Sequence, residues 1–145
     1  MKKTITLLAI LCVLNAFATD RFVDPNLSQG NGTTLFTTIT SAVAAAQNGD
    51  RIIVVSSTYN EAELTINKSI QIIPQIAGTT INFNANILVS GFPGMNLEII
   101  GFNLGSYFIT TTAPSGGNPF NGTEINIIGC SASNISINDN GYLLN

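Results

Sequence analysis

The chain has 145 residues, of which 45% are hydrophobic and only 9% are charged, and its net charge is −3. This length and composition suit a single domain with a sizeable apolar core. The scarcity of lysine and arginine argues against nucleic acid or an anionic membrane as partner, because no basic patch is available to displace the counterions of phosphate groups.

Residues 1–18 have the three regions of a secretory signal peptide. Two lysines precede the apolar run 5–13, and the small residues of Ala16-Phe17-Ala18 predict cleavage after Ala18. The apolar run is too short to span a bilayer, which needs roughly 20 residues. We therefore predict that residues 19–145 form a domain that is secreted or held at the cell surface, with the periplasm as an alternative location. From residue 19 onward, three basic residues face eight acidic ones, so the mature charge is −5.

A short amphipathic helix is predicted over residues 39–46. Its apolar residues fall at i, i+3, i+4 and i+7, which gives one narrow stripe. Thr38 or Thr40 is expected as the N-cap, and Gly49 as the left-handed residue that ends the helix. A helix of two to three turns is stable only when it is packed. We expect it to cover the open end of a stack of strands.

Short strands are predicted along the rest of the chain. Residues 52–55 are a continuous apolar run, typical of a strand that is buried on both faces or that starts a parallel sheet. Apolar residues then alternate through residues 64–66 and 70–72, on either side of the polar turn 67–69. Further strands are expected at 80–83 and 87–89.

An internal repeat links the later strands. Residues 97–104 superpose on residues 125–132 at an offset of 28, and residues 70–74 superpose on the same block at an offset of 27. Such spacing suits one turn of a parallel β-helix with three short strands per turn. At the same offset Tyr107 superposes on Ile135, which predicts that Tyr107 lies in the core.

The register of the repeat separates inward from outward side chains. Leu97 and Ile99 are expected to stack on the core side over their equivalents one turn later, and Phe102 over Cys130 places that cysteine in the core. Cys130 is the only cysteine after residue 18, so we expect no internal disulfide. On the outward side, the repeat predicts a polar ladder that consists of Gln71, Glu98 and Asn126. These side chains would hydrogen-bond along the coil, contact sugar hydroxyls, or simply be solvated.

Residues 21–74 together resemble the N-terminal coil of pectin-lyase-like right-handed parallel β-helix proteins. The resemblance implies a right-handed β-helix with an N-terminal capping helix, and Glu61 falls at a position that is structural in the family. Where several members have Pro-Gly-Thr-Tyr, this chain has Ser56-Ser57-Thr58-Tyr59. The motifs that carry the resemblance are Val23-Asp24-Pro25, Phe36-Thr37-Thr38-Ile39, Gly49-Asp50 with Ile52 and Val54, Tyr59 with Glu61, and Ile66-Asn67-Lys68-Ser69-Ile70.

Little in the chain supports catalysis. It has no histidine, and no lysine or arginine follows Lys68, so the stacked turns lack the base that lyase chemistry needs. Glu98 and Glu124 are the candidate pair for glycoside hydrolysis, because the repeat places them on one outward face within about 10 Å of each other. We interpret them as surface charges. No metal-ligating set or cofactor motif is present, so we predict neither a metal nor a cofactor.

We therefore predict an all-β fold, a right-handed parallel β-helix with a short capping α-helix, that acts as a non-catalytic binding or structural scaffold. The expected partner is a polysaccharide or another cell-surface protein. One alternative is the N-terminal part of a polysaccharide lyase or glycoside hydrolase with its active site beyond residue 145, and another is an adhesin-like stalk. Residues 135–145 still show a strand-turn-strand pattern without a capping helix, so further chain or a partner is expected to cover that end.

Overall fold

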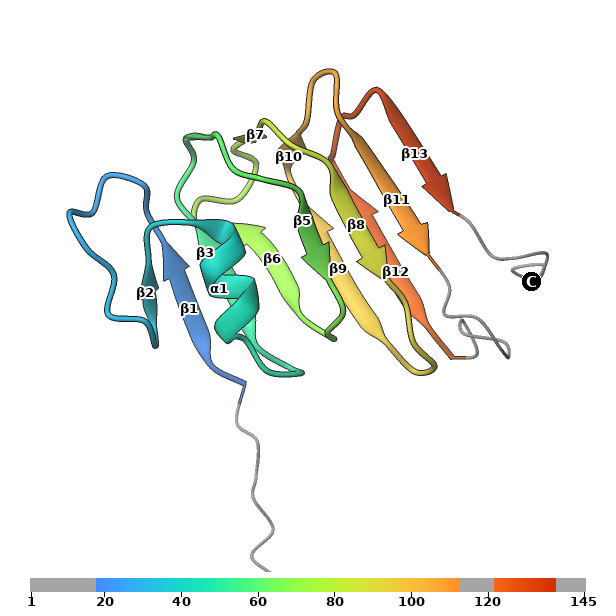
Figure 1. Ribbon diagram of the computed structural model, residues 1–145, viewed down its shortest axis with the longest axis horizontal. Helices are drawn as coiled ribbons and strands as arrows, with labels where there is room; N and C mark the ends of the chain where they lie inside the picture. Colours follow the sequence, from blue (N-terminus) through green and yellow to red (C-terminus); the bar gives the residue numbers. More distant parts are fainter. Residues whose placement is uncertain (1–17, 113–121, 138–145) are drawn as a thin grey trace, which may run out of the picture.

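The computed structural model describes residues 18–112 and 122–137, which form a β-solenoid of about three turns (Figure 1). The predicted fold class is confirmed. In chain order the elements are β1 (Asp20–Val23), β2 (Leu35–Phe36), α1 (Ile39–Ala45), β3 (Arg51–Val54), β4 (Thr58–Tyr59), β5 (Leu64–Ile66), β6 (Gln71–Pro74), β7 (Ile81–Phe83), β8 (Ile87–Ser90), β9 (Asn96–Ile100), β10 (Phe102–Asn103), β11 (Phe108–Thr112), β12 (Glu124–Ile128) and β13 (Asn134–Ile137).

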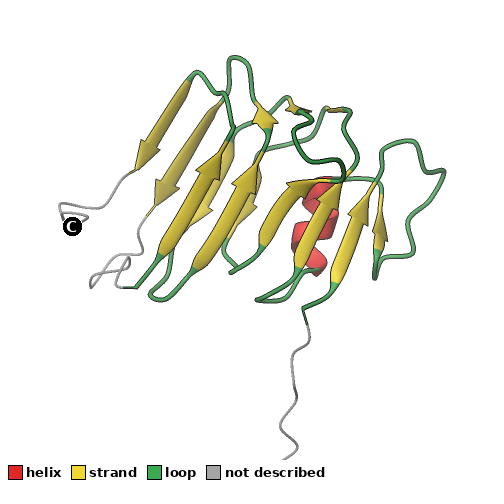
Figure 2. Cartoon of the chain, turned by 180° about the vertical axis from the view of Figure 1, so that it is seen from behind, coloured by secondary structure: helices red, strands yellow, loops and turns green. Residues whose placement is uncertain are grey.

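The strands form three sheets, and from β3 to β11 each turn of the chain adds one strand to each sheet. The six-stranded sheet has the order β12-β9-β6-β3-β1-β2, the four-stranded sheet β13-β11-β8-β5, and the three-stranded sheet β10-β7-β4. Every pairing between neighbouring strands is parallel. The helix lies behind the six-stranded sheet in Figure 2, on the side that faces the core.

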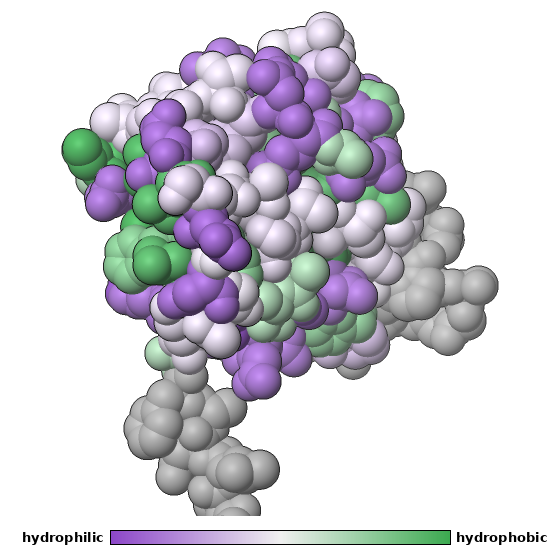
Figure 3. Space-filling view, turned by 60° about the vertical axis from the view of Figure 1, so that its left-hand side comes forward, coloured by the Kyte–Doolittle hydropathy of each residue, from purple (hydrophilic) through white to green (hydrophobic). Residues whose placement is uncertain are grey.

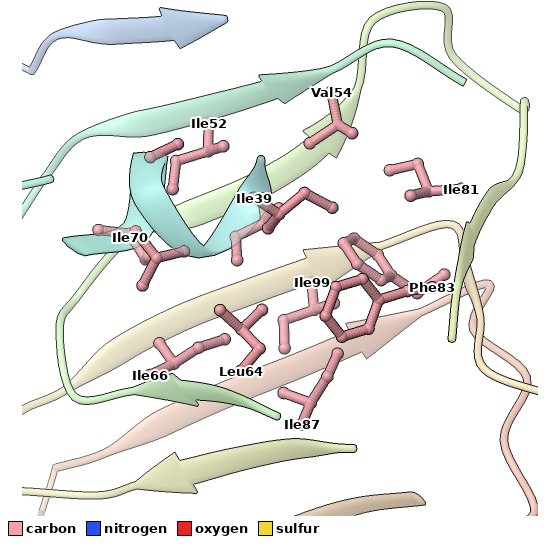
Figure 4. Packing of buried hydrophobic residues seen from close by; sticks show 14 of the residues in the cluster. Ile39, Ile52, Val54, Leu64, Ile66, Ile70, Ile81, Phe83, Ile87 and Ile99 are labelled. Atoms are coloured by element: carbon pink, nitrogen blue, oxygen red, sulfur yellow. The ribbon is translucent and has the colours of Figure 1, made fainter. Parts of the chain in front are cut away.

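Alternate residues of the strands fill the space between the sheets. Ile52, Ile72 and Ile99 belong to three successive turns, and all are fully buried at 0% exposure. Phe83 and Phe102 meet edge to face, with ring centroids 6.0 Å apart. Figure 4 shows aliphatic side chains such as Ile52 and Ile99 converging with Phe83 from strands far apart in sequence. Each fully buried side chain of this size contributes about 1.5–3 kcal/mol, so the stacked turns stabilise one another.

The helix is confirmed, but it ends earlier than expected. The backbone N–H of Ser41 donates to the side-chain oxygen of Thr38, which is the N-cap. The helix covers only Ile39–Ala45, because Ala46 is already extended with a ψ of 153°. The prediction that Gly49 ends the helix was therefore wrong. Gly49 has a φ of +93° but lies in the turn before β3, where its N–H donates to the carbonyl of Ser69 over 2.6 Å.

Two oppositely charged side chains from the turn that follows the helix contact the ends of α1. The Glu61 carboxylate accepts the backbone N–H groups of Ile39 and Thr40 over 2.7 and 2.8 Å, and also the Thr40 hydroxyl. The Lys68 ammonium donates to the carbonyls of Val43 and Ala44, each over 2.8 Å. An anion at the start and a cation at the end complement the helix dipole. Glu61 therefore has a structural contact of the kind that the resemblance implied.

The repeat offsets are confirmed in the six-stranded sheet and fail in the four-stranded one. Gln71 lies opposite Glu98, and Glu98 lies opposite Asn126. Ile135, however, pairs with Ile109 instead of Tyr107, because the turn after Asn103 is two residues longer than the turn after Ser131. Tyr107 sits in that longer turn and is 39% exposed, so the prediction of a core position was wrong.

Cys130 is half-buried and packs against the hydrophobic core. Its sulfur accepts the backbone N–H of Phe102 over 3.4 Å, in agreement with the predicted stacking of these two residues. Burial raises the pKa of the Cys130 thiol, and backbone N–H groups oppose this only in part. The thiol is therefore mostly protonated at neutral pH. Residues 1–17 of the predicted signal peptide 1–18 lie outside the described residues, as do residues 138–145.

Candidate functional site

A row of polar side chains runs along the outer face of the six-stranded sheet. In strands β3, β6 and β9 the residues before and after the polar position are buried, so the polar side chain points outward. Strand pairing places them opposite one another from β1 to β12. We call this set the polar row; it consists of Asp20, Arg51, Gln71, Glu98 and Asn126.

Hydrogen bonds join two pairs of neighbouring side chains in the polar row. The Arg51 guanidinium donates two hydrogen bonds to the Asp20 carboxylate, over 2.8 and 2.7 Å, and this contact holds the pKa of Asp20 below its ordinary value. The Gln71 amide donates to Glu98 over 2.9 Å. The Asn126 amide donates to Glu124, two residues earlier in the same strand, over 2.9 Å. The predicted ladder is therefore present, and it extends two strands further toward the N-terminus than the sequence indicated.

An apolar row runs beside the polar row, two residues further along each strand. Phe22 is 38% exposed and Ile128 is 48% exposed, while the residues between them are half-buried. On β2, Leu35 continues the row opposite Phe22 and is 40% exposed. We call this set the apolar row; it consists of Leu35, Phe22, Ile53, Ile73, Ile100 and Ile128.

The apolar row was not predicted as a surface. A continuous apolar run such as 52–55 is typical of a strand that is covered on both faces. The structure instead leaves Ile53 half-exposed on the outer face, and none of the described elements crosses that face in Figure 2. A continuous apolar strip with a polar border is the usual mark of an interaction surface. The signal for it was the apolar pair in each strand, one facing inward and one outward.

Glu98 and Glu124 are diagonal neighbours on this face. Glu98 lies opposite Asn126, and Glu124 lies opposite Asn96. With strands about 4.8 Å apart and a rise of about 3.3 Å per residue, positions two residues apart on neighbouring strands are about 8 Å apart, which agrees with the separation expected from the repeat. Each carboxylate accepts a side-chain amide of the polar row, Glu98 from Gln71 and Glu124 from Asn126. The two acids thus lie on one face as the repeat predicted, and their interpretation as surface charges instead of a catalytic pair stays a prediction.

A second polar ladder, on the three-stranded sheet, was missed. The Asn103 amide donates to Asn82 over 3.0 Å, and the Ser131 hydroxyl donates to Asn103 over 2.9 Å. Asn84 donates to Asn60 over 2.6 Å, directly after the ends of β7 and β4. The available signal was the recurrence of asparagine in the strand segments 82–84 and 103, at spacings shorter than the 27 and 28 residues of the repeat. These amides bond to one another, so they hold the turns in register.

Two cavities border the cap and the outer face. One, of about 280 Å³, lies at the start of the strands beside the polar row, with Arg51, Gln71 and Asn96 in its lining. The other, of about 460 Å³, lies between α1 and the loop before β2, with Leu35 and Ala45 in its lining. Glu98 and Glu124 line neither cavity. Among the described residues, no group of three or more His, Cys, Asp or Glu side chains is arranged to hold a metal ion.

In the described part of the chain, no helix has the length and apolar character that crossing a membrane requires. Comparison with known proteins matched this chain to no family model, no curated protein and no solved structure.

Proposed function

We propose that the protein is a secreted or cell-surface β-solenoid that binds a neutral polysaccharide along the outer face of its six-stranded sheet and has no catalytic site of its own. The observation that carries the proposal is a polar row that pairs from strand to strand between β1 and β12, with an apolar residue two positions further along each of these strands. An extended polymer of repeating units would meet the same pair of contacts at successive strands.

The chemistry of the two rows suits sugar units. Amide and carboxylate groups such as those of Gln71, Glu98 and Asn126 donate to and accept from hydroxyl groups. The apolar row offers apolar surface for the C–H faces of sugar rings, with the aromatic ring of Phe22 next to Leu35 at one end. Adjacent strands are about 4.8 Å apart, so neighbouring rungs are close enough to contact one ligand together.

The charge of this face favours a neutral ligand over an acidic one. Glu98 and Glu124 add negative charge, and the Arg51 guanidinium is engaged with Asp20. The predicted mature chain also has a net charge of −5. A polyanionic chain such as a uronic-acid polymer would meet like charge along this face, which disfavours its approach.

We also propose that the chain is a divergent relative of the pectin-lyase-like β-helix proteins. The solenoid and its short N-terminal helix support this relationship. The contacts of Glu61 with the helix start and of the buried Tyr59 hydroxyl with the carbonyl of Val55 support it further, since both residues belong to the motifs of the resemblance.

A second candidate is the N-terminal portion of a longer solenoid, either an enzyme or an adhesin-like stalk. Ile135 occupies the inward position opposite Ile109, yet it is 44% exposed whereas Ile109 is 0% exposed. An inward isoleucine that the described residues leave open is where a further strand, or a partner, would pack. In this case any catalytic group lies outside the described turns.

The test of polysaccharide binding uses the chain 19–145 and insoluble neutral glucans and xylans, with polygalacturonate as the acidic comparison. We expect retention on at least one neutral polymer and none on polygalacturonate. Gln71→Ala combined with Ile100→Ser should lower the affinity about tenfold or more, which corresponds to about 1.4 kcal/mol. Thr65→Ala, on an exposed position of the four-stranded sheet, is the matched control. Equal retention of both variants, or retention on none of the neutral polymers, would contradict the proposal.

A further inference from the structure

Asp50 is the most deeply buried acidic side chain among the described residues, with 2% of its surface exposed. One carboxylate oxygen accepts the guanidinium of Arg21 and the backbone N–H of Gln47, each over 2.8 Å. The other oxygen accepts the backbone N–H of Thr19, also over 2.8 Å. Burial alone would raise the pKa of Asp50, but these hydrogen bonds from Gln47, Thr19 and Arg21 hold it below its ordinary value.

The contact between the Thr19 nitrogen and Asp50 is notable because of where Thr19 lies in the sequence. Thr19 directly follows Ala18, after which the signal-peptide pattern predicts cleavage. Ala18 itself is exposed and lines the cavity of about 280 Å³, together with Asp50 and Arg51. The bond between Ala18 and Thr19 therefore lies at the border between solvent and the buried carboxylate. The residue that would become the new N-terminus already points its nitrogen at that carboxylate.

Cleavage changes the chemistry of this nitrogen. Water adds across the peptide bond; its hydroxyl goes to the carbonyl carbon of Ala18, which becomes a carboxylate, and the freed Thr19 amine is protonated to an ammonium group at neutral pH. A neutral amide donor thus becomes a cation with three donors. One of them keeps the direction of the contact with Asp50, and the adjoining cavity gives the others access to water.

We propose that hydrolysis of the Ala18–Thr19 bond by a secretory endopeptidase creates an ion pair between the new Thr19 ammonium group and the buried carboxylate of Asp50, so that processing completes the folded structure. This inference rests on the secretion part of the proposed function and is independent of the binding face. The ion pair joins the first residue of the mature chain to the turn before β3, where the N–H of Gln71 also donates to the carbonyl of Asp50 over 3.1 Å.

The ion pair makes stability depend on pH in a defined direction. Asp50 faces the ammonium group and raises its pKa, while Arg21 on the other carboxylate oxygen opposes this increase; Asp20 and Arg51 lie next to the site and pair with each other. A raised amine pKa stabilises the fold fully below the pKa of the unfolded chain, about 7.7–8.0. This stabilisation is lost as the pH rises through the folded pKa.

The decisive experiment compares two purified chains, one beginning at Thr19 and one beginning at Ala18, each released from a fusion by a protease that leaves no extra residue. Both keep the Thr19 nitrogen as a donor, but the longer chain places its ammonium group one residue away from Asp50. At pH 6.5 we expect the chain that begins at Thr19 to melt about 2–5 °C higher. The difference should shrink above the folded amine pKa. Equal melting temperatures at pH 6.5 would overturn the proposal.

Two further measurements support the comparison. Asp50→Asn in both chains should abolish the difference in melting temperature, and a difference that persists would overturn the proposal. If the Asn variants do not fold, NMR can instead measure the pKa of the Thr19 amine in the chain that begins at Thr19. An amine pKa equal to that of the unfolded chain counts against the ion pair. The exported product of the full chain should begin at Thr19, and another first residue would refute the processing step. Polysaccharide binding is scored separately, so its failure leaves these results intact.

Discussion

Two strands of the six-stranded sheet have closely similar sequences and very different burial. In β9, Leu97 and Ile99 are 0% exposed, whereas their equivalents in β12, Ile125 and Ile127, are half-buried. β9 lies between β6 and β12, while β12 pairs only with β9 among the described residues. The same local pattern thus contributes different amounts of stability, because in a solenoid the neighbouring turn provides most of the buried surface.

The opposite end of the solenoid is closed by α1. The helix buries Ile39, Ala42 and Val43, and charged side chains from the following turn hold both of its ends. Figure 3 looks toward this end and shows hydrophilic side chains interspersed with small apolar patches. One end of the solenoid is closed, and the other is open among the described residues. Equivalent substitutions at the two ends should therefore lower the stability by different amounts.

The largest effect is expected at the cap. Val43→Asp places a carboxylate at a position that is 3% exposed, and the cost of burying it should exceed about 4 kcal/mol. The expected result is loss of cooperative thermal unfolding, with aggregation seen by light scattering. Ala44→Asp, on the exposed side of the same helix, is the control and should cost less than about 1 kcal/mol. A soluble monomer with unchanged unfolding for Val43→Asp would show that the helix is not needed to close the stack.

The comparison of the repeats themselves is tested by Leu97→Ala and Ile125→Ala. The first removes a fully buried side chain and should lower the free energy of unfolding by about 2–5 kcal/mol. The second removes a half-buried side chain, so we expect about half of that loss. Urea denaturation of the two variants gives both values. Equal losses would mean that β12 is covered in solution as fully as β9.

Substitutions at two glycines one turn apart, directly after β9 and β12, also test the comparison of these two strands. Gly101 has a φ of +73°, and a Cβ atom there would lie 2.9 Å from the carbonyl oxygen of Thr79. Gly129 has a φ of +60°, with nothing within 4 Å of such an atom. Backbone strain of about 1–3 kcal/mol is expected for valine at either position, and Gly101→Val adds the clash. Thermal unfolding should therefore rank Gly101→Val as the more damaging change, and the reverse order would contradict the geometry of this turn.

The smallest effect is expected from the charged contacts of the helix. Glu61→Gln keeps an acceptor near the helix start but removes the charge, at a cost of about 1–2 kcal/mol. Glu63→Gln is the matched control, because Glu63 is exposed and lies two residues away. Chemical denaturation at low and high salt measures both. A loss for Glu63→Gln as large as that for Glu61→Gln would indicate a general effect of net charge.

Much of the solenoid followed from local patterns. The stripe of residues 39–46 predicted the helix, and the 27- and 28-residue offsets predicted the pairing of β6, β9 and β12. The outward ladder of Gln71, Glu98 and Asn126 followed from the same register. These features depend on side-chain periodicity and on repeat length, which a sequence displays directly.

Other features depend on contacts between residues far apart in the chain. Tyr107 was placed in the core because a constant offset was assumed, and one turn that is longer by two residues moved it to the surface. The extension of the polar row to Asp20 and Arg51 depends on pairing across 31 residues, where no repeat is visible.

The sequence by itself determined the solenoid class, the position of the cap and the inward and outward alternation of its later strands, because periodicity acts between neighbours in the chain. Only the tertiary structure places Ile53, Ile73 and Ile100 half-buried on the outer face, brings Glu61 and Lys68 to the ends of the helix, and buries Asp50 beside the Thr19 nitrogen. The physical reason is that burial and charge pairing depend on which turns stack on one another, and the lengths of the connecting turns set that stacking.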